Sequence, residues 1–168
     1  WNQFTKVFAG DSGAIYAIKP DGKLLWYGHL GQREGLDSWA QGSGAEIGNG
    51  WTMASGGGTH KDVFAGPKGV IYSLSTAGEL RWYRHDGYNG SGKGFAEGSG
   101  TIISTGLNDT TSMIAGANKA IYRATSDGSL HYYRHNAQLT GTLAGTTTGL
   151  TTWANNGASK VITSNWGG

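Results

Sequence analysis

The chain has 168 residues, of which 31 are glycine, two are proline and none is cysteine. Without cysteine there is no disulfide framework and no thiolate zinc site, so a buried core or association with further copies must hold the chain together. The formal net charge of +2 comes from scattered single Lys and Arg residues, which argues against nucleic acid as a partner. No apolar stretch approaches the roughly 18 residues of a membrane span, so no membrane insertion is expected.

Three copies of one repeat organise the chain, and such self-similarity decides the fold. The repeated segments are Val7-Phe8-Ala9-Gly10, Val63-Phe64-Ala65-Gly66 and Met113-Ile114-Ala115-Gly116, followed by Ala14-Ile15-Tyr16, Val70-Ile71-Tyr72 and Ala120-Ile121-Tyr122. We therefore predict a single repeat domain over residues 1–168, with units at approximately 1–51, 52–107 and 108–168.

Each unit is predicted to hold four short strands. In the first unit these are residues 4–9, 14–18, 24–29 and 46–51, which are rich in aliphatic and aromatic side chains. Between the second and third strands of each unit stands a turn signal, at Pro20-Asp21-Gly22, Ala77-Gly78 and Asp127-Gly128. No segment has helical periodicity, so the fold class is all-β.

Four strands in a repeat of about 50 residues indicate a β-propeller blade, and a β-trefoil is the alternative for a three-repeat chain. Trp26, Trp82 and Tyr132 occupy one repeat position, where we expect them to pack unit on unit. Propellers usually need about four to eight blades to close. A homodimer forming a six-bladed ring is therefore expected, unless the chain is part of a longer protein.

The order of motifs in the first unit resembles one repeat of the tachylectin-type β-propeller lectins. The matching segments are residues 4–8, 13–17, 26–27, 37–40 and 47–51. The resemblance implies four-stranded blades with sugar sites between neighbouring blades, and a carbohydrate-binding lectin for N-acetylated hexosamines such as N-acetylglucosamine and N-acetylgalactosamine. The best-known fold of the family closes with five repeats, whereas this chain departs from it in having three longer ones.

The element Asp37-Ser38-Trp39 is the strongest candidate for a sugar site, because it combines an aromatic ring with a carboxylate and a hydroxyl. It matches the Asp-Asn-Trp element of the family. Its counterparts are Lys93-Gly94-Phe95 and Thr151-Thr152-Trp153, which lack the carboxylate and are ranked weaker. The alternative is that Trp39, Phe95 and Trp153 fill the core between blades.

Three histidines, His29, His85 and His135, recur at one position of the repeat. They do not form a metal site in a propeller, because equivalent positions lie far apart whereas ligands must converge on one ion. We expect each imidazole to bond the next loop, with a place in the wall of a sugar pocket as the alternative.

Catalysis is not expected. The eleven acidic residues show no paired arrangement, and no nucleophile motif is present. The prediction is a multivalent, non-catalytic lectin without cofactor or metal, which binds glycans or glycoconjugates and is secreted or extracellular, its leader removed or borne on a longer precursor. The alternatives are a structural or protein-interaction propeller and an accessory sugar-binding domain of a larger secreted hydrolase.

Overall fold

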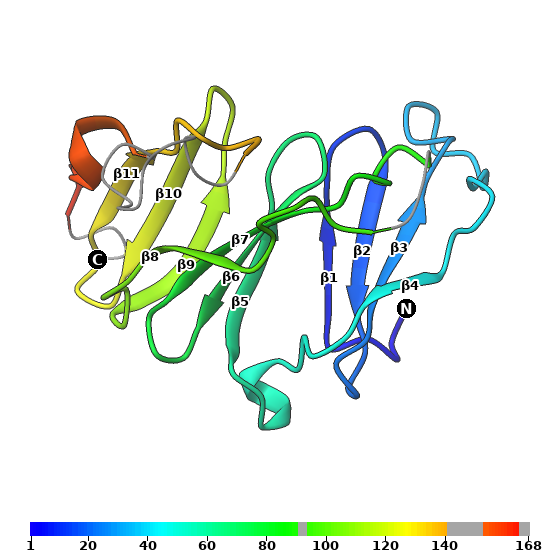
Figure 1. The fold of residues 1–168 in the computed structure, drawn as a ribbon, viewed down its shortest axis with the longest axis horizontal. Helices are drawn as coiled ribbons and strands as arrows, with labels where there is room; N and C mark the ends of the chain where they lie inside the picture. Colours follow the sequence, from blue (N-terminus) through cyan, green and yellow to red (C-terminus); the bar gives the residue numbers. More distant parts are fainter. Residues whose placement is uncertain (91–93, 141–152, 165–168) are drawn as a thin grey trace.

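A computed structural model describes residues 1–90, 94–140 and 153–164 and folds them into three four-stranded antiparallel sheets (Figure 1). Each sheet is a meander whose strands follow chain order. The first sheet comprises β1 (Lys6–Ala9), β2 (Ala14–Ile18), β3 (Leu24–Gly28) and β4 (Ala45–Gly48); the second β5 (His60–Ala65), β6 (Val70–Ser75), β7 (Leu80–Arg84) and β8 (Thr101–Ser104); the third β9 (Thr110–Ala115), β10 (Ala120–Thr125), β11 (Leu130–Arg134) and β12 (Lys160–Thr163). Two 3₁₀ turns, Ala54–Gly56 and Ala154–Gly157, are the only helical segments among these residues.

The prediction of an all-β chain with four strands per unit is confirmed. Gly22, Gly78 and Gly128 have φ of 82°, 76° and 80°, the left-handed conformation that a hairpin turn requires of glycine. The fourth strand ends at Gly48 rather than at Trp51. It ends early because the Trp51 amide donates to the Gly22 carbonyl at 2.9 Å, which turns the chain across the hairpin instead of along the sheet.

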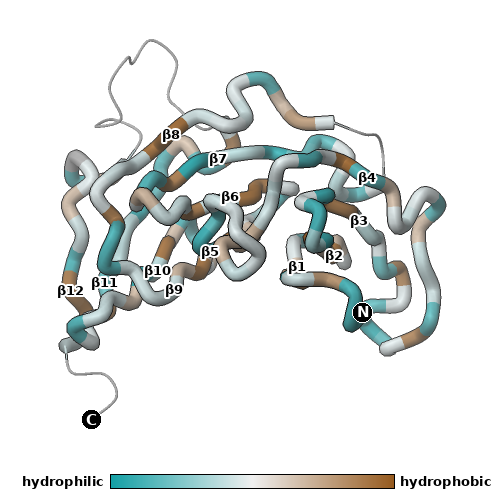
Figure 2. The backbone as a smooth tube through the Cα atoms, turned by 90° about the horizontal axis from the view of Figure 1, so that it is seen from below, coloured by the Kyte–Doolittle hydropathy of each residue, from teal (hydrophilic) through white to brown (hydrophobic). Residues whose placement is uncertain are grey.

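The sheets follow one another along an arc, with β1, β5 and β9 on its inner side (Figure 2). β5 contacts both β1 and β9, so the inner strands are direct neighbours. The arc is open between the first and third sheets (Figure 2). Among the described residues the sheets do not close a ring, and the complete propeller stays a prediction.

The hydrophobic core lies between successive sheets. One buried cluster joins Tyr16, Leu24 and Trp26 of the first unit to Val63 and Ile71 of the second. The other joins the second unit to the third in the same way, through residues that include Leu74, Trp82, Met113, Ile121 and Trp153. Each sheet is therefore stabilised by the unit beside it.

Two pairs of side chains tie neighbouring units together at equivalent places. The Tyr16 hydroxyl lies 3.3 Å from Nδ1 of His85, and the Tyr72 hydroxyl lies 2.8 Å from Nδ1 of His135. Burial raises the pKa of both tyrosines, so their hydroxyls stay protonated. These pairs bridge the first unit to the second and the second to the third.

The predicted unit-on-unit packing of Trp26 and Trp82 is confirmed. The Trp26 indole donates to the carbonyl of Tyr88 at 3.0 Å, and the Trp82 indole donates to the carbonyl of Gln138 at 2.8 Å. Both acceptors belong to the following unit. Tyr132, at the corresponding position of the third unit, contacts Tyr122 of its own sheet.

Acid should destabilise the chain through His85. This imidazole is fully buried, and burial lowers its pKa from 6.5 to about 4. The nearby Asp86 carboxylate opposes this shift, because its negative charge favours the protonated ring. Between these two pH values the unfolded chain binds a proton that the native chain does not, so stability is full above pH 6.5 and falls as the pH drops toward 4. The loss from this group should reach about 3 kcal/mol.

Urea unfolding followed by tryptophan fluorescence between pH 7 and pH 4 measures this effect. The variant His85→Gln is the control, because glutamine can still hydrogen-bond the Tyr16 hydroxyl but cannot take up a proton. We expect a shallower pH dependence for the variant. An identical slope in the two proteins would contradict the role given to His85.

Candidate functional site

The Asp37-Ser38-Trp39 element lies in the loop between β3 and β4 and is anchored to the end of β3. Trp39 forms an isolated antiparallel bridge with His29, and the Leu30 amide donates to the Ser38 carbonyl at 2.8 Å. Further along the loop, Ser43 Oγ accepts a hydrogen bond from the Gly28 amide at 3.1 Å. The sheet therefore fixes the position of the element, although the loop is largely exposed.

An open pocket of about 440 Å³ lies beside this element. Its lining combines aromatic rings with a few polar side chains, namely Trp1, Gln3, Phe4, Tyr27, Asp37, Trp39 and Ser43. The Trp1 ring lies 4.7 Å from the Tyr27 ring and 6.0 Å from the Trp39 ring, measured between centroids. Trp1 is 55% exposed and Trp39 is 38% exposed, so ring surface is available to a ligand.

Asp37 orients the indole of Trp39. Its Oδ1 accepts a hydrogen bond from Nε1 of Trp39 at 2.6 Å. The carboxylate has a second oxygen, and at this exposed residue that oxygen can accept hydrogen bonds from a ligand. The pocket thus joins an apolar platform to a charged acceptor. Of the three residues selected from the sequence, Asp37 and Trp39 line it, whereas Ser38 is not among the lining residues and Ser43 supplies a hydroxyl instead.

Sequence reasoning did not select Trp1, Phe4 or Tyr27 for this pocket. We call the surface formed by Trp1, Phe4, Tyr27 and Trp39 the aromatic face. A signal for Trp1 and Tyr27 was present, because Trp1 shares a repeat position with Trp51 and Leu107, and Tyr27 shares one with Tyr83 and Tyr133. The repeat pattern alone did not show that the Trp1 and Tyr27 side chains line one pocket.

The rings of the next repeat that are equivalent to Trp1, Tyr27 and Trp39 are those of Trp51, Tyr83 and Phe95. Strand β4 lies against these rings. Trp51 lies 4.5 Å from Tyr83 and 6.3 Å from Phe95, but it is only 4% exposed. A Cβ added at Gly48 would lie 2.9 Å from Nε1 of Trp51 and 3.3 Å from the Phe95 ring, which shows how closely the strand approaches. Ile47 packs in the same cluster.

The third unit repeats this covering with β8. Trp153 is 7% exposed, and its indole donates to the Ile103 carbonyl at 2.7 Å. Its ring lies 5.9 Å from that of Tyr133. Trp153 therefore lies in the core between units, and the partly buried Phe95 packs against the core between the first and second units. Of the other residues of these two counterpart elements, Gly94 is described, whereas Lys93, Thr151 and Thr152 lie outside the described residues.

The three repeated histidines have two different environments. The His29 ring stacks on Trp39 at 4.9 Å, and its Nε2 lies 2.8 Å from the Leu36 carbonyl in the following loop, as expected. His85 and His135 are fully buried between units. Of the three, His29 is the one beside the open pocket.

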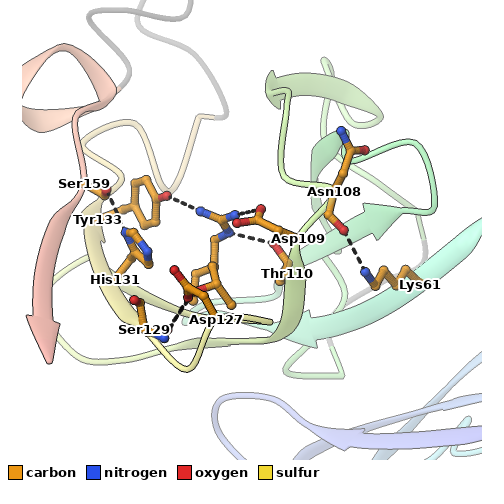
Figure 3. Close-up of polar contacts among 11 residues, drawn as sticks. Lys61, Asn108, Asp109, Thr110, Asp127, Ser129, His131, Tyr133 and Ser159 are labelled. Atoms are coloured by element: carbon orange, nitrogen blue, oxygen red, sulfur yellow. Dashed lines mark hydrogen bonds and ion pairs between the residues drawn. The ribbon is translucent and has the colours of Figure 1, made fainter. Parts of the chain in front are cut away.

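A polar cluster in the third unit was not anticipated (Figure 3). The Arg123 side chain is buried, with 6% of its surface exposed. Its Nε donates a hydrogen bond to Thr110 Oγ1 at 2.7 Å, and its Nη1 donates one to the Tyr133 hydroxyl at 3.1 Å. Its Nη2 forms an ion pair with Asp109. These contacts link β10 to β9, to β11 and to the turn before β9. The sequence signal is an arginine where the other units have Ala17 and Ser73. Because all three guanidinium nitrogens donate to protein atoms, we assign the cluster a structural role, in which it stabilises the third sheet.

Within the described ranges no three or more His, Cys, Asp or Glu side chains gather in a way that could hold a metal ion. The same residues include no helix with the length and apolar character to cross a membrane.

Comparison with known proteins gives a family and a fold. The tachylectin family model matches residues 1–56 and 52–167. A solved structure described as "The de novo evolutionary emergence of a symmetrical protein is shaped by folding constraints" is similar to this chain, with a TM-score of 0.55 and 17% identity over 99% of this chain. The chain spans 60% of that structure's length, and at this identity the likeness shows the fold alone. No curated protein matches the sequence.

Replacing the exposed Trp39 should lower the free energy of unfolding much less than replacing the buried Trp153. Trp153→Ala should cost about 3–5 kcal/mol, because it empties a buried site and removes the partner of the Ile103 carbonyl. Trp39→Ala should cost at least about 2 kcal/mol less, because part of this ring already faces water. Urea unfolding of the two variants measures the difference, and equal losses would contradict the assignment of Trp39 to an open site.

Proposed function

The chain belongs to the tachylectin family, and on that basis we propose that it is a carbohydrate-binding protein that recognises N-acetylated hexosamines. The observation that supports this most directly is the open pocket on the aromatic face, with Asp37 at its edge. The family suggests a lectin-like role, and the pocket provides side chains suited to one.

The pocket chemistry fits a pyranose ring. A sugar presents an apolar face of C–H groups, which stacks on Trp39 or Trp1, and hydroxyl groups at its edge, which need hydrogen-bond partners. Asp37 offers a carboxylate acceptor, while the Ser43 hydroxyl and the Gln3 amide line the same pocket. An acetamide group adds an N–H donor for the carboxylate and a methyl group for an aromatic ring.

The proposal gives the first unit the strongest site. The elements at Phe95 and Trp153 remain weaker candidates, because β4 and β8 would have to be displaced before a sugar could stack on those rings. His85 and His135 are fully buried, so they offer no surface to a sugar. Multivalency then depends on such weaker sites or on display of several chains, either of which raises avidity for a surface with many glycans.

We also propose that the protein is non-catalytic and acts outside the cell, where glycan-coated surfaces are found. Asp37 is the one carboxylate among the residues that line the pocket. Glycoside hydrolysis by the common mechanisms uses two carboxyl groups that flank the scissile bond. A single carboxylate beside aromatic rings favours binding over hydrolysis.

Isothermal titration with N-acetylglucosamine and N-acetylgalactosamine tests the proposal, with glucose as the sugar that lacks the acetamide. Asp37→Asn and Trp39→Ala should each weaken binding at least about tenfold, which corresponds to about 1.4 kcal/mol. Asp21→Asn is the matched control, because Asp21 is an exposed carboxylate in a hairpin turn and is not among the residues that line the pocket. It should leave affinity unchanged.

Two results would count against the proposal. A glycan array without a hexosamine signal, together with no heat on titration, would remove the carbohydrate-binding function. Hexosamine binding that survives both pocket substitutions would keep the function and move its site elsewhere on the chain.

A further inference from the structure

Asn49 and Gly50 join β4 to Trp51, where the chain leaves the first sheet for the second unit. Both residues are exposed, and Gly50 has φ of 78°. A Cβ added at Gly50 would meet no atom within 4 Å, so the space around this peptide is open. An Asn-Gly pair in such a turn is chemically labile, because glycine leaves the following amide free to approach the asparagine side chain.

The Gly50 amide is available as a nucleophile. Among the described residues it donates to no carbonyl and to no side chain, and the Asn49 side chain has no hydrogen-bond partner there either. The chain beyond it is fixed, since the Gly50 carbonyl lies 3.0 Å from Nε2 of His60 and the Trp51 amide donates to the Gly22 carbonyl at 2.9 Å. An unpaired amide therefore lies next to an exposed side-chain amide.

We propose that Asn49 is a site of spontaneous deamidation, and that this modification weakens the contact between the first and second units. The Gly50 amide nitrogen attacks Cγ of Asn49 and forms the new C–N bond of a five-membered succinimide. The bond between Cγ and the side-chain nitrogen breaks, and this nitrogen leaves as ammonia with the proton that Gly50 gives up. A water molecule then opens the ring at either carbonyl, which yields aspartate or isoaspartate.

The other two Asn-Gly pairs of the sequence lie in hydrogen-bonded turns. At Asn89-Gly90, the Gly90 amide donates to the Gly87 carbonyl at 2.9 Å. Asn156-Gly157 lies in the 3₁₀ turn Ala154–Gly157, and such turns are built from amide bonds between residues three apart. An amide held in this way must lose its hydrogen bond before it can attack, so Asn49 should be the most reactive of the three in the native chain.

The modified link positions a buried tryptophan. Trp51 is 4% exposed, and its ring lies 4.5 Å from that of Tyr83. Isoaspartate routes the main chain through the former side chain and so lengthens the connection between β4 and Trp51, and both products add a negative charge. The longer connection displaces β4 from the anchors at Gly22 and His60, so the first and second units pack less closely.

The second unit has the same turn without the reactive side chain. Thr105-Gly106 occupies the corresponding position, Gly106 has φ of 77°, and the Leu107 amide donates to the Gly78 carbonyl at 3.0 Å. Threonine has no side-chain amide to lose. Asn49→Thr is therefore a matched variant that should retain the turn and cannot be deamidated at this position.

Parallel incubation of the native chain and of the chain unfolded in guanidinium, at mildly alkaline pH, tests the site. Mass spectrometry of the digested samples follows the replacement of NH₂ by OH in each Asn-Gly peptide. The rate in the unfolded chain serves as the reference, because unfolding removes the turns. We expect the native-to-unfolded rate ratio of Asn49 to exceed that of Asn89 at least about threefold. A smaller difference would overturn the assignment of Asn49 as the reactive site.

Urea unfolding before and after incubation tests the effect on the contact between the units. The incubated parent chain should unfold at a lower urea concentration, in proportion to its isoaspartate content, which enzymatic methylation of isoaspartate measures. Asn49→Thr should fold when fresh and keep its midpoint after incubation. Equal losses in the two proteins, or no loss in a parent chain that has been deamidated, would overturn the proposed weakening of the contact.

Discussion

The fourth strand of each unit lies across the aromatic rings of the next unit, and this contact determines much of the remaining structure. β4 covers Trp51 and Phe95, while β8 covers Trp153 and accepts its indole hydrogen bond at Ile103. The buried tyrosine and histidine pairs strengthen the same boundary. A chain without cysteine has no disulfide between its sheets, so burial between units must supply their stability. The contact also explains why a unit at the end of the arc differs from one inside it.

The candidate site follows from that difference. Trp1, Tyr27 and Trp39 have the same relation to their sheet as Trp51, Tyr83 and Phe95 have to theirs, but none of the strands in the described part of the chain lies across them. Rings that fill the core in the second and third units are therefore open to a ligand in the first. The first unit alone also has a carboxylate in this element, Asp37, which holds the Trp39 indole. One repeat position thus serves stability where it is covered and is available for recognition where it is not.

Much of this could be predicted from the sequence, because the repeats constrain each other. The strands, the hairpin glycines and the packing of Trp26 and Trp82 follow from local patterns that occur three times, so a weak signal in one copy is supported by the others. The exposure of Trp39, the partial burial of Phe95 and the full burial of Trp153 could not be predicted in this way. Equivalent positions have equivalent sequence signals, and only the presence of a neighbouring strand separates them. The Arg123 cluster was missed for the opposite reason, since it occurs in one unit and has no repeat to reveal it.

We propose that a carbohydrate binds the open aromatic face and not the covered rings. Titration of the isotope-labelled chain with N-acetylglucosamine, followed through the indole N–H signals, measures this directly, because each tryptophan reports its own surroundings. We expect saturable shifts of the Trp1 and Trp39 signals, while the Trp51 and Trp82 signals stay unmoved. Shifts confined to the buried indoles, or no shifts at any sugar concentration, would contradict it.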